Sequence, residues 1–180
     1  IRPERLWLVA NSMGGQVVVD AFSELYRDAD FGDPAVEIED VVLTAPDVDR
    51  ARFNEQFKAE LSALARNTTV YVSSNDRALL ASRIVNRARR LGESTLSKEE
   101  SELLDAVEAA FELLEPGNDR VTLVDVTPVN RTRNFHNFSL EVPEYFDDIF
   151  LRLTNDETPE NRQRYPFRTS QGKVYWVLTR

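Results

Sequence analysis

Three side chains of this sequence, Ser12, Asp76 and His136, are of the types that together turn a hydroxyl group into a nucleophile. A serine hydroxyl attacks a carbonyl carbon poorly unless a base takes its proton, and a neutral imidazole suits that role. A carboxylate that accepts a hydrogen bond from the other ring nitrogen orients the imidazole and stabilises its protonated form. The elements around these residues must therefore bring them together from distant parts of the chain.

The turn at Ser12 has the residues that such a nucleophile requires. The stretch "LWLVANSMGGQ" (6–16) is an apolar run that ends at Ser12, with Ala10 two positions before it and Gly14 two positions after it. Small residues there let a strand turn sharply into a helix with the serine at the tip, and the backbone N–H of Met13 then becomes an oxyanion donor. The same stretch also fits a glycine-rich turn in which Ser12 only caps the helix. A phosphate-binding loop is disfavoured because no G-K-[ST] follows.

Four apolar runs predict the strands of the fold, at 6–10, 41–45, 68–74 and 121–126. Because these runs do not alternate with polar residues, they are typical of parallel strands that are covered on both faces. Helical spacing of apolar residues follows Gly15 and recurs at 51–66, 77–91, 97–115 and 143–153. We therefore predict an α/β fold, with a parallel sheet of about four strands flanked by helices.

The predicted sheet places the three side chains at one edge. The carboxyl ends of parallel strands meet at a single edge, where open α/β sheets hold their sites. Ser12 follows the first strand, Asp76 the third and His136 the fourth. Two ordinary roles stay open, since Asp76 also fits a helix cap and His136 an exposed loop residue. Asp47, after the second strand, is the alternative acid, and a loop or capping role is open for it as well.

The composition limits the classes of partner. The chain has 180 residues, 42% of them hydrophobic, which is enough for one domain with a real core. Its net charge of −9 argues against nucleic acid and anionic membranes as main partners, because both attract basic surfaces. With no cysteine and one histidine, it can form neither a disulfide nor a metal site of several histidines. No apolar run approaches the ~20 residues of a transmembrane helix.

We predict a domain over residues 1–153, interrupted at about 93–118 by a helical insertion that is either a lid or a surface addition. The polar tail, 154–180, ends in "KVYWVL", which fits a short strand or a docking segment. The first predicted strand is strongly apolar, but no predicted strand pairs with its outer edge, and such an edge invites association. We therefore expect that an N-terminal half of the fold is supplied by the same gene or by another chain.

The stretches "LWLVANSMGGQVVVDAF", "VVLTAPDVD" and "VYVSSNDRAL", together with the histidine loop, resemble the α/β-hydrolase superfamily. More closely, they resemble a largely uncharacterised bacterial family of esterase- and lipase-like hydrolases, over about residues 5–153. The resemblance implies that Ser12 is the nucleophile, Asp76 the acid and His136 the base. The chain order Ser–Asp–His is the usual order in this superfamily.

Two residues depart from the pattern of this family. Ala10 stands in place of the usual first glycine, and Asn11 stands where histidine often precedes the serine. In such enzymes a second oxyanion donor comes from a loop in the first half of the fold. This chain is therefore expected to hold the three catalytic side chains and one oxyanion donor, the N–H of Met13.

The resemblance and the site residues together predict a serine esterase that forms an acyl-enzyme on a small-molecule ester and needs no metal or organic cofactor. One alternative is a hydrolase-fold protein that no longer catalyses and serves as a binding or scaffold domain. Another is the same triad acting on a thioester or an amide, because the loops that select the leaving group cannot be interpreted from the sequence.

Overall fold

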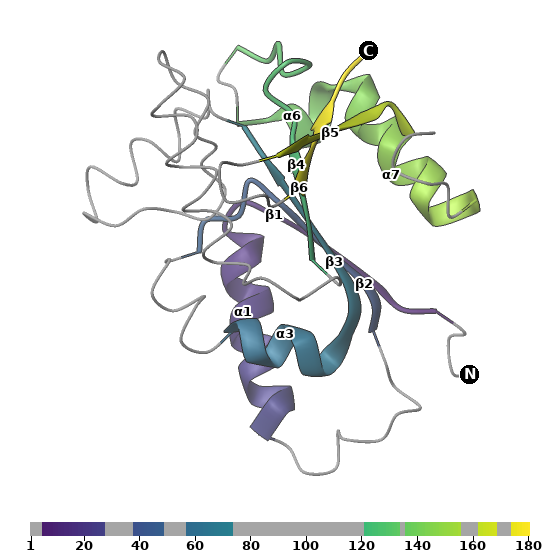
Figure 1. Cartoon of the computed structure of the whole chain (residues 1–180). Coiled ribbons are helices and arrows are strands. Elements are labelled where there is room, and N and C mark those ends of the chain that lie inside the picture. Colours follow the sequence, from purple (N-terminus) through teal and green to yellow (C-terminus); the bar gives the residue numbers. More distant parts are fainter. Residues whose placement is uncertain are drawn as a thin grey trace.

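Figure 1 shows the computed structural model of the chain, which describes residues 5–27, 38–48, 57–73, 121–133, 136–155, 162–168 and 174–180. Its elements are, in chain order, β1 (Trp7–Asn11), α1 (Gly14–Arg27), β2 (Ile38–Thr44), α3 (Lys58–Leu64), β3 (Ala65–Val72), β4 (Val121–Asp125), α6 (Phe138–Glu141), α7 (Pro143–Asn155), β5 (Arg164–Arg168) and β6 (Val174–Leu178). The predicted helices at 77–91 and 97–115, with the insertion at 93–118, lie outside the described residues.

The six strands form one sheet in the order β1-β2-β3-β4-β6-β5. All neighbouring pairs are parallel except β5 and β6. The four predicted parallel strands are confirmed as β1 to β4. The sheet is wider than predicted, because "KVYWVL" supplies β6 and the preceding segment supplies β5. The sequence of β5 contains Pro166, a residue that argues against a strand in sequence-based prediction but that a sheet tolerates in an edge strand.

Helices cover both faces of this sheet, as the apolar strands predict (Figure 1). On one face, Phe22 of α1 packs edge-to-face against Phe57, with 5.6 Å between the ring centroids. On the other face, Tyr145 of α7 packs in the same way against Tyr71 of β3, at 4.9 Å. Burying a large apolar side chain stabilises the fold by roughly 1.5–3 kcal/mol. The two cores therefore hold the sheet firmly from both sides.

The first four strands end nearly level at one edge of the sheet. In the register of the strands, Thr44 at the end of β2 lies opposite Tyr71 of β3, and Val72 of β3 lies opposite Asp125 at the end of β4. Hydrogen bonding continues past the end of β2, since the Ala45 N–H donates to the Tyr71 carbonyl at 3.0 Å. The segments after β1, β2, β3 and β4 therefore all begin at this edge of the sheet.

A buried ion pair fastens the C-terminal strands to the rest of the fold. Arg164 of β5 donates two hydrogen bonds to the carboxylate of Asp148 on α7, and its guanidinium also donates to the Tyr71 hydroxyl at 2.9 Å. All three side chains are fully buried. Leaving one partner of such a pair alone in the interior costs about 3–5 kcal/mol. The interaction thus joins β5, α7 and β3, which no local sequence pattern reveals.

Candidate active site

Ser12 lies at the tip of a sharp turn between β1 and α1. Its φ of 52° places its backbone in the left-handed region, which few residues with a side chain adopt. The Ser12 N–H donates to the Thr44 carbonyl at the end of β2, and the Gly15 N–H donates to the Ser12 carbonyl, both at 2.9 Å. Backbone strain of about 1–3 kcal/mol persists only where the surroundings enforce it. Here the strand on one side and the helix on the other enforce it together.

The two glycines at the start of α1 allow close packing around this turn. A Cβ atom on Gly14 would lie 3.6 Å from the Cβ of Ala10, so these positions have room for small side chains. A Cβ atom on Gly15 would lie 3.1 Å from the Cβ of Pro46 and 3.2 Å from Cγ2 of Val48, closer than ordinary contacts. The turn therefore accommodates Ala10 in place of a glycine, whereas a side chain at position 15 would press on the segment after β2.

The imidazole of His136 meets the Ser12 hydroxyl at the carboxyl edge of the sheet. Nε2 of His136 lies 2.8 Å from Oγ of Ser12, and both residues are half-buried. When the ring proton is on Nδ1, Nε2 accepts the hydrogen bond from the hydroxyl. A general base must lie within this distance of the proton that it takes. The two residues are 124 positions apart in the chain, so the fold alone brings them together.

Comparison with protein families identifies the fold to which this site belongs. The family model described as an alpha/beta hydrolase of unknown function (DUF900) matches residues 2–144, which is most of the chain. The chain belongs to this α/β-hydrolase family. The parallel sheet with its flanking helices is therefore part of an α/β-hydrolase fold. No curated protein and no solved structure gave a significant match.

The backbone N–H of Met13 lies directly after Ser12, one residue before α1 begins. It donates a hydrogen bond to none of the described residues. Met13 is 73% exposed, so its side chain lies at the surface and not in the core. The N-terminus of a helix favours negative charge, and the N–H after the nucleophile is the usual oxyanion donor of this kind of turn. The geometry is thus compatible with the predicted oxyanion role.

The predicted acid, Asp76, lies outside the described residues, four positions beyond the end of β3. The alternative acid, Asp47, is half-buried, and its backbone N–H donates to the Ser12 carbonyl at 3.1 Å. This contact gives Asp47 a structural role in the loop beside the nucleophile turn. The structure thus brings Ser12 and His136 together, while the assignment of the acid to Asp76 stays a prediction.

Asp125 is a buried carboxyl group at this edge that the sequence analysis missed. Its Oδ1 accepts hydrogen bonds from the Thr127 N–H, at 2.8 Å, and from the Thr127 hydroxyl. Its Oδ2 is buried without a hydrogen-bond partner in the described part of the chain. Burial raises the pKa of Asp125 to about 6, although the hydrogen bonds from Thr127 act in the opposite direction. The signal in the sequence was a lone charge inside the apolar run "VTLVDV".

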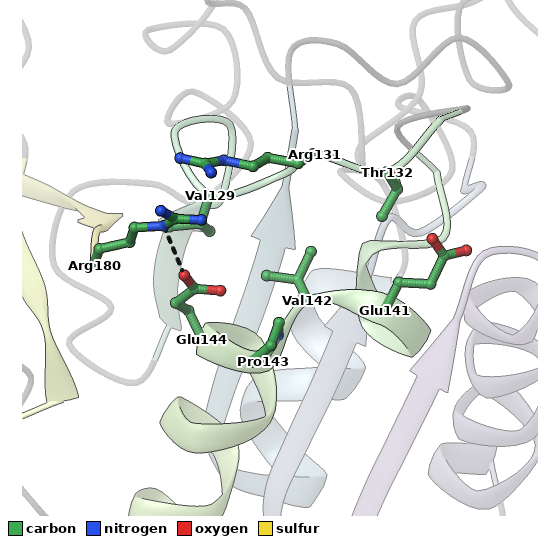
Figure 2. A pocket seen from close by; sticks show the side chains of 8 residues that line it. All are labelled: Val129, Arg131, Thr132, Glu141, Val142, Pro143, Glu144 and Arg180. Carbon is green, nitrogen blue, oxygen red and sulfur yellow. Dashed lines mark hydrogen bonds and ion pairs between the residues drawn. The ribbon is translucent and has the colours of Figure 1, made fainter.

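A small cavity lies beside the loop that carries His136 (Figure 2). Its volume is about 140 Å³, and Val129 and Arg131 of this loop form part of its wall. Near these two residues, Arg180 pairs with Glu144 of α7, with 3.1 Å between Nε and Oε1 (Figure 2). Within the described ranges, no group of three His, Asp or Glu residues could hold a metal ion, and no helix is long and apolar enough to cross a membrane.

Proposed function

We propose that this α/β-hydrolase is a serine esterase that cleaves a carboxylic ester through an acyl-enzyme, with Ser12 as nucleophile, His136 as general base and Asp76 as the acid. The observation that carries the proposal is the 2.8 Å contact between Ser12 Oγ and His136 Nε2. The positive φ of Ser12 supports it, because this strained turn holds the hydroxyl out from the sheet.

The proposed reaction has two halves. In the first, Ser12 Oγ forms a bond to the ester carbon while its proton passes to His136 Nε2, and the carbonyl oxygen becomes an oxyanion beside the Met13 N–H. Collapse of this intermediate breaks the bond to the alcohol, which leaves with the proton from His136. In the second half, water gives a proton to His136 and attacks the acyl-enzyme, which releases the acid and restores the Ser12 hydroxyl. Asp76 orients the imidazole and stabilises its charge in both halves.

We also propose that further polypeptide, from the same gene or from another chain, covers the outer edge of β1 and supplies the second oxyanion donor. The two edges of the sheet support this. The edge strand β5 carries Pro166 between charged ends, features that block pairing with another strand. The edge strand β1 has the sequence WLVAN, with neither proline nor charge, and Val9 within it is 54% exposed. An apolar, unprotected edge is typical of a strand that pairs with a neighbour.

The test is the substitution Ser12→Ala in the full-length gene product, assayed with short-chain aryl esters and with a fluorophosphonate probe. We expect the wild type to hydrolyse the esters and to be labelled, and the variant to lose both properties while its circular dichroism spectrum is unchanged. Losing an activated nucleophile lowers turnover by up to about 10⁶-fold. Ser23→Ala, which changes a buried serine farther along α1, is the matched control and should keep both properties.

Two results would overturn the proposal. Full ester turnover by Ser12→Ala would exclude Ser12 as the nucleophile. A wild-type protein that neither turns over esters nor reacts with the probe would favour the alternative of a non-catalytic binding domain. Labelling of Ser12 combined with faster cleavage of thioesters or amides than of esters would keep the nucleophile and replace the substrate class.

A further inference from the structure

We infer that Asn130 is a positioning residue that holds His136 in reach of Ser12, an inference that rests on the proposed function. Asn130 lies in the segment between β4 and α6, six residues before His136, and it is only 4% exposed. No part of the reaction described above uses it. The argument comes from what this segment must span and from what holds it in place.

The segment after β4 has to cross the edge of the sheet. Ser12 follows β1 and His136 follows β4, and the strands β2 and β3 lie between them. With neighbouring strands about 4.8 Å apart, three intervals amount to about 14 Å. The segment after β4 must therefore bridge this distance before the imidazole can reach the hydroxyl. Such a loop holds the imidazole of His136 at a fixed distance from Ser12 only if contacts with the sheet hold the loop in place.

Asn130 makes the contact that ties this loop to the end of β3. Its Nδ2 donates to the hydroxyl of Ser73 at 2.8 Å, and its Oδ1 accepts from the Thr132 hydroxyl at 2.8 Å and from the Thr132 N–H at 3.3 Å. The Thr132 N–H can only donate, so the amide atom that faces it must be the oxygen. The nitrogen therefore faces Ser73, and one amide bridges the sheet and the loop.

Burial and neighbouring contacts make this bridge rigid. Ser73 is fully buried, and Thr132 is buried as well, so solvent cannot readily replace either hydrogen bond. On the other side of His136, the ring of Phe138 is fully buried and packs against Tyr145, with 5.7 Å between centroids. His136 thus lies between two anchored points, one polar and one apolar.

The bridge also connects the two segments that carry the proposed base and acid. Ser73 comes three positions before Asp76 in the chain, and Asn130 comes six positions before His136. The amide of Asn130 therefore ties the segment before His136 to Ser73, the last described residue before Asp76. A displacement of about 1 Å in a catalytic group can cost about 100-fold in rate, so loss of the bridge should reduce turnover even though Asn130 is not expected to touch the substrate.

The test compares three single substitutions in the full-length gene product. Asn130→Ala removes the bridge, and Ser73→Ala removes its partner while it leaves Asn130 in place. Ser23→Ala is the matched control, because the Ser23 hydroxyl also donates a buried side-chain hydrogen bond of 2.8 Å, to Glu60. Ser23 lies nine residues beyond Gly14 in α1, outside the proposed site. For each variant, kcat and KM on an aryl ester, the rate of fluorophosphonate labelling and the melting temperature are measured.

We expect Asn130→Ala and Ser73→Ala to lower kcat and the labelling rate by about 10- to 100-fold, with KM changed by less than about threefold. The control should lose a comparable amount of melting temperature and keep kcat within about twofold of the wild type. If Asn130→Ala does not fold, Ser73→Ala carries the test. Wild-type kcat in the folded variants, or an effect on KM alone, would overturn the positioning role. Because Ser12→Ala is assayed in parallel, these outcomes are separate from failure of the proposed function.

Discussion

At Ser12, a φ of 52° turns the hydroxyl away from the sheet and toward the loop that carries His136. The residue is otherwise ordinary, since a free serine hydroxyl is a weak nucleophile. Its proposed reactivity depends on the left-handed backbone, on the imidazole 2.8 Å away and on the Met13 N–H, which donates to no other group among the described residues. Each of these is a property of the position and not of the residue type.

Asp125 gives a prediction at the same scale, about stability and pH. Its pKa is about 6 in the folded state, against a usual value of 3.8, because burial disfavours its charge. The folded state therefore binds the proton more tightly than the unfolded state does, and the contribution of Asp125 to stability falls as the pH rises from about 4 to 6. Asp125→Asn removes this loss. Relative to wild type, the variant should gain up to about 3 kcal/mol in free energy of unfolding between pH 4 and pH 7.

Urea denaturation at a series of pH values measures this difference. Asp147→Asn, which removes an exposed carboxyl group on α7, is the control and should leave the profile close to that of the wild type. A difference between Asp125→Asn and wild type that stays constant from pH 4 to pH 7 would contradict the prediction.

At the scale of elements, the site depends on how closely α1 approaches the segment after β2. Gly15 allows that approach. The Ser12 N–H donates to the Thr44 carbonyl and the Asp47 N–H donates to the Ser12 carbonyl, so backbone hydrogen bonds connect the turn at Ser12 to the same segment. The loop after β4 is held in a comparable way by Asn130 on Ser73. The elements thus meet at the carboxyl edge through short polar contacts, while apolar packing holds them deeper in the fold.

The two adjacent glycines of α1 give a prediction with an internal control. Gly15→Ala should lower the free energy of unfolding by about 1–3 kcal/mol, because the new Cβ would press on Pro46 and Val48, both of which are buried. Gly14→Ala places its Cβ at an ordinary distance from Ala10 and should be neutral or stabilising by up to about 1 kcal/mol, since alanine favours helix. Thermal and chemical denaturation of both variants would measure the contrast. Equal stabilities would contradict the close approach of α1.

At the scale of the whole molecule, the two edges of the sheet differ. The β5 edge is protected by Pro166 and held by the buried pair of Arg164 and Asp148. Among the described residues, the β1 edge has no such protection, and Leu6 and Val9 are exposed along it. Further apolar side chains are exposed on the helices of both faces, at Val17, Tyr26, Phe146, Phe150 and Leu153. The two edges therefore differ in protection, and the unprotected strand, β1, is the one that Ser12 follows.

This asymmetry predicts how the 180-residue chain behaves alone. At micromolar concentrations it should self-associate through β1, because an apolar edge strand without a partner pairs with another chain. Val9→Lys should shift it toward monomer, since a charged side chain on an edge opposes pairing. Tyr165→Lys, at an exposed position on the protected β5 edge, is the control and should have little effect. Light scattering after size-exclusion chromatography measures the mass. A wild-type chain that stays monomeric at high concentration would contradict the proposal for the β1 edge.

The sequence was sufficient to predict the four central strands, their parallel arrangement and the sharp turn at Ser12, because these depend on local signals. Unalternating apolar runs indicate strands that are covered on both faces, and small residues on either side of Ser12 indicate a sharp turn. The family match confirms the α/β-hydrolase resemblance. The strand β5 was not predicted because it contains a proline, which is tolerated only at a sheet edge, and the buried Arg164, which requires the buried carboxylate of Asp148. Neither condition can be known from neighbours in the chain.

Contacts between distant residues had to come from the folded molecule. His136 could be identified as a candidate base because it is the one histidine of the chain and follows the fourth strand. Its 2.8 Å approach to Ser12 depends on the order of the strands and on the loop after β4, which local signals do not determine. Asn130 and Ser73 carry no local signature of a special role, since asparagine and serine are common after strands. Asp125 carries only the weak signal of a lone charge in an apolar run. The importance of these three residues follows from burial, which removes water as an alternative partner and makes each remaining hydrogen bond specific to one arrangement of the chain.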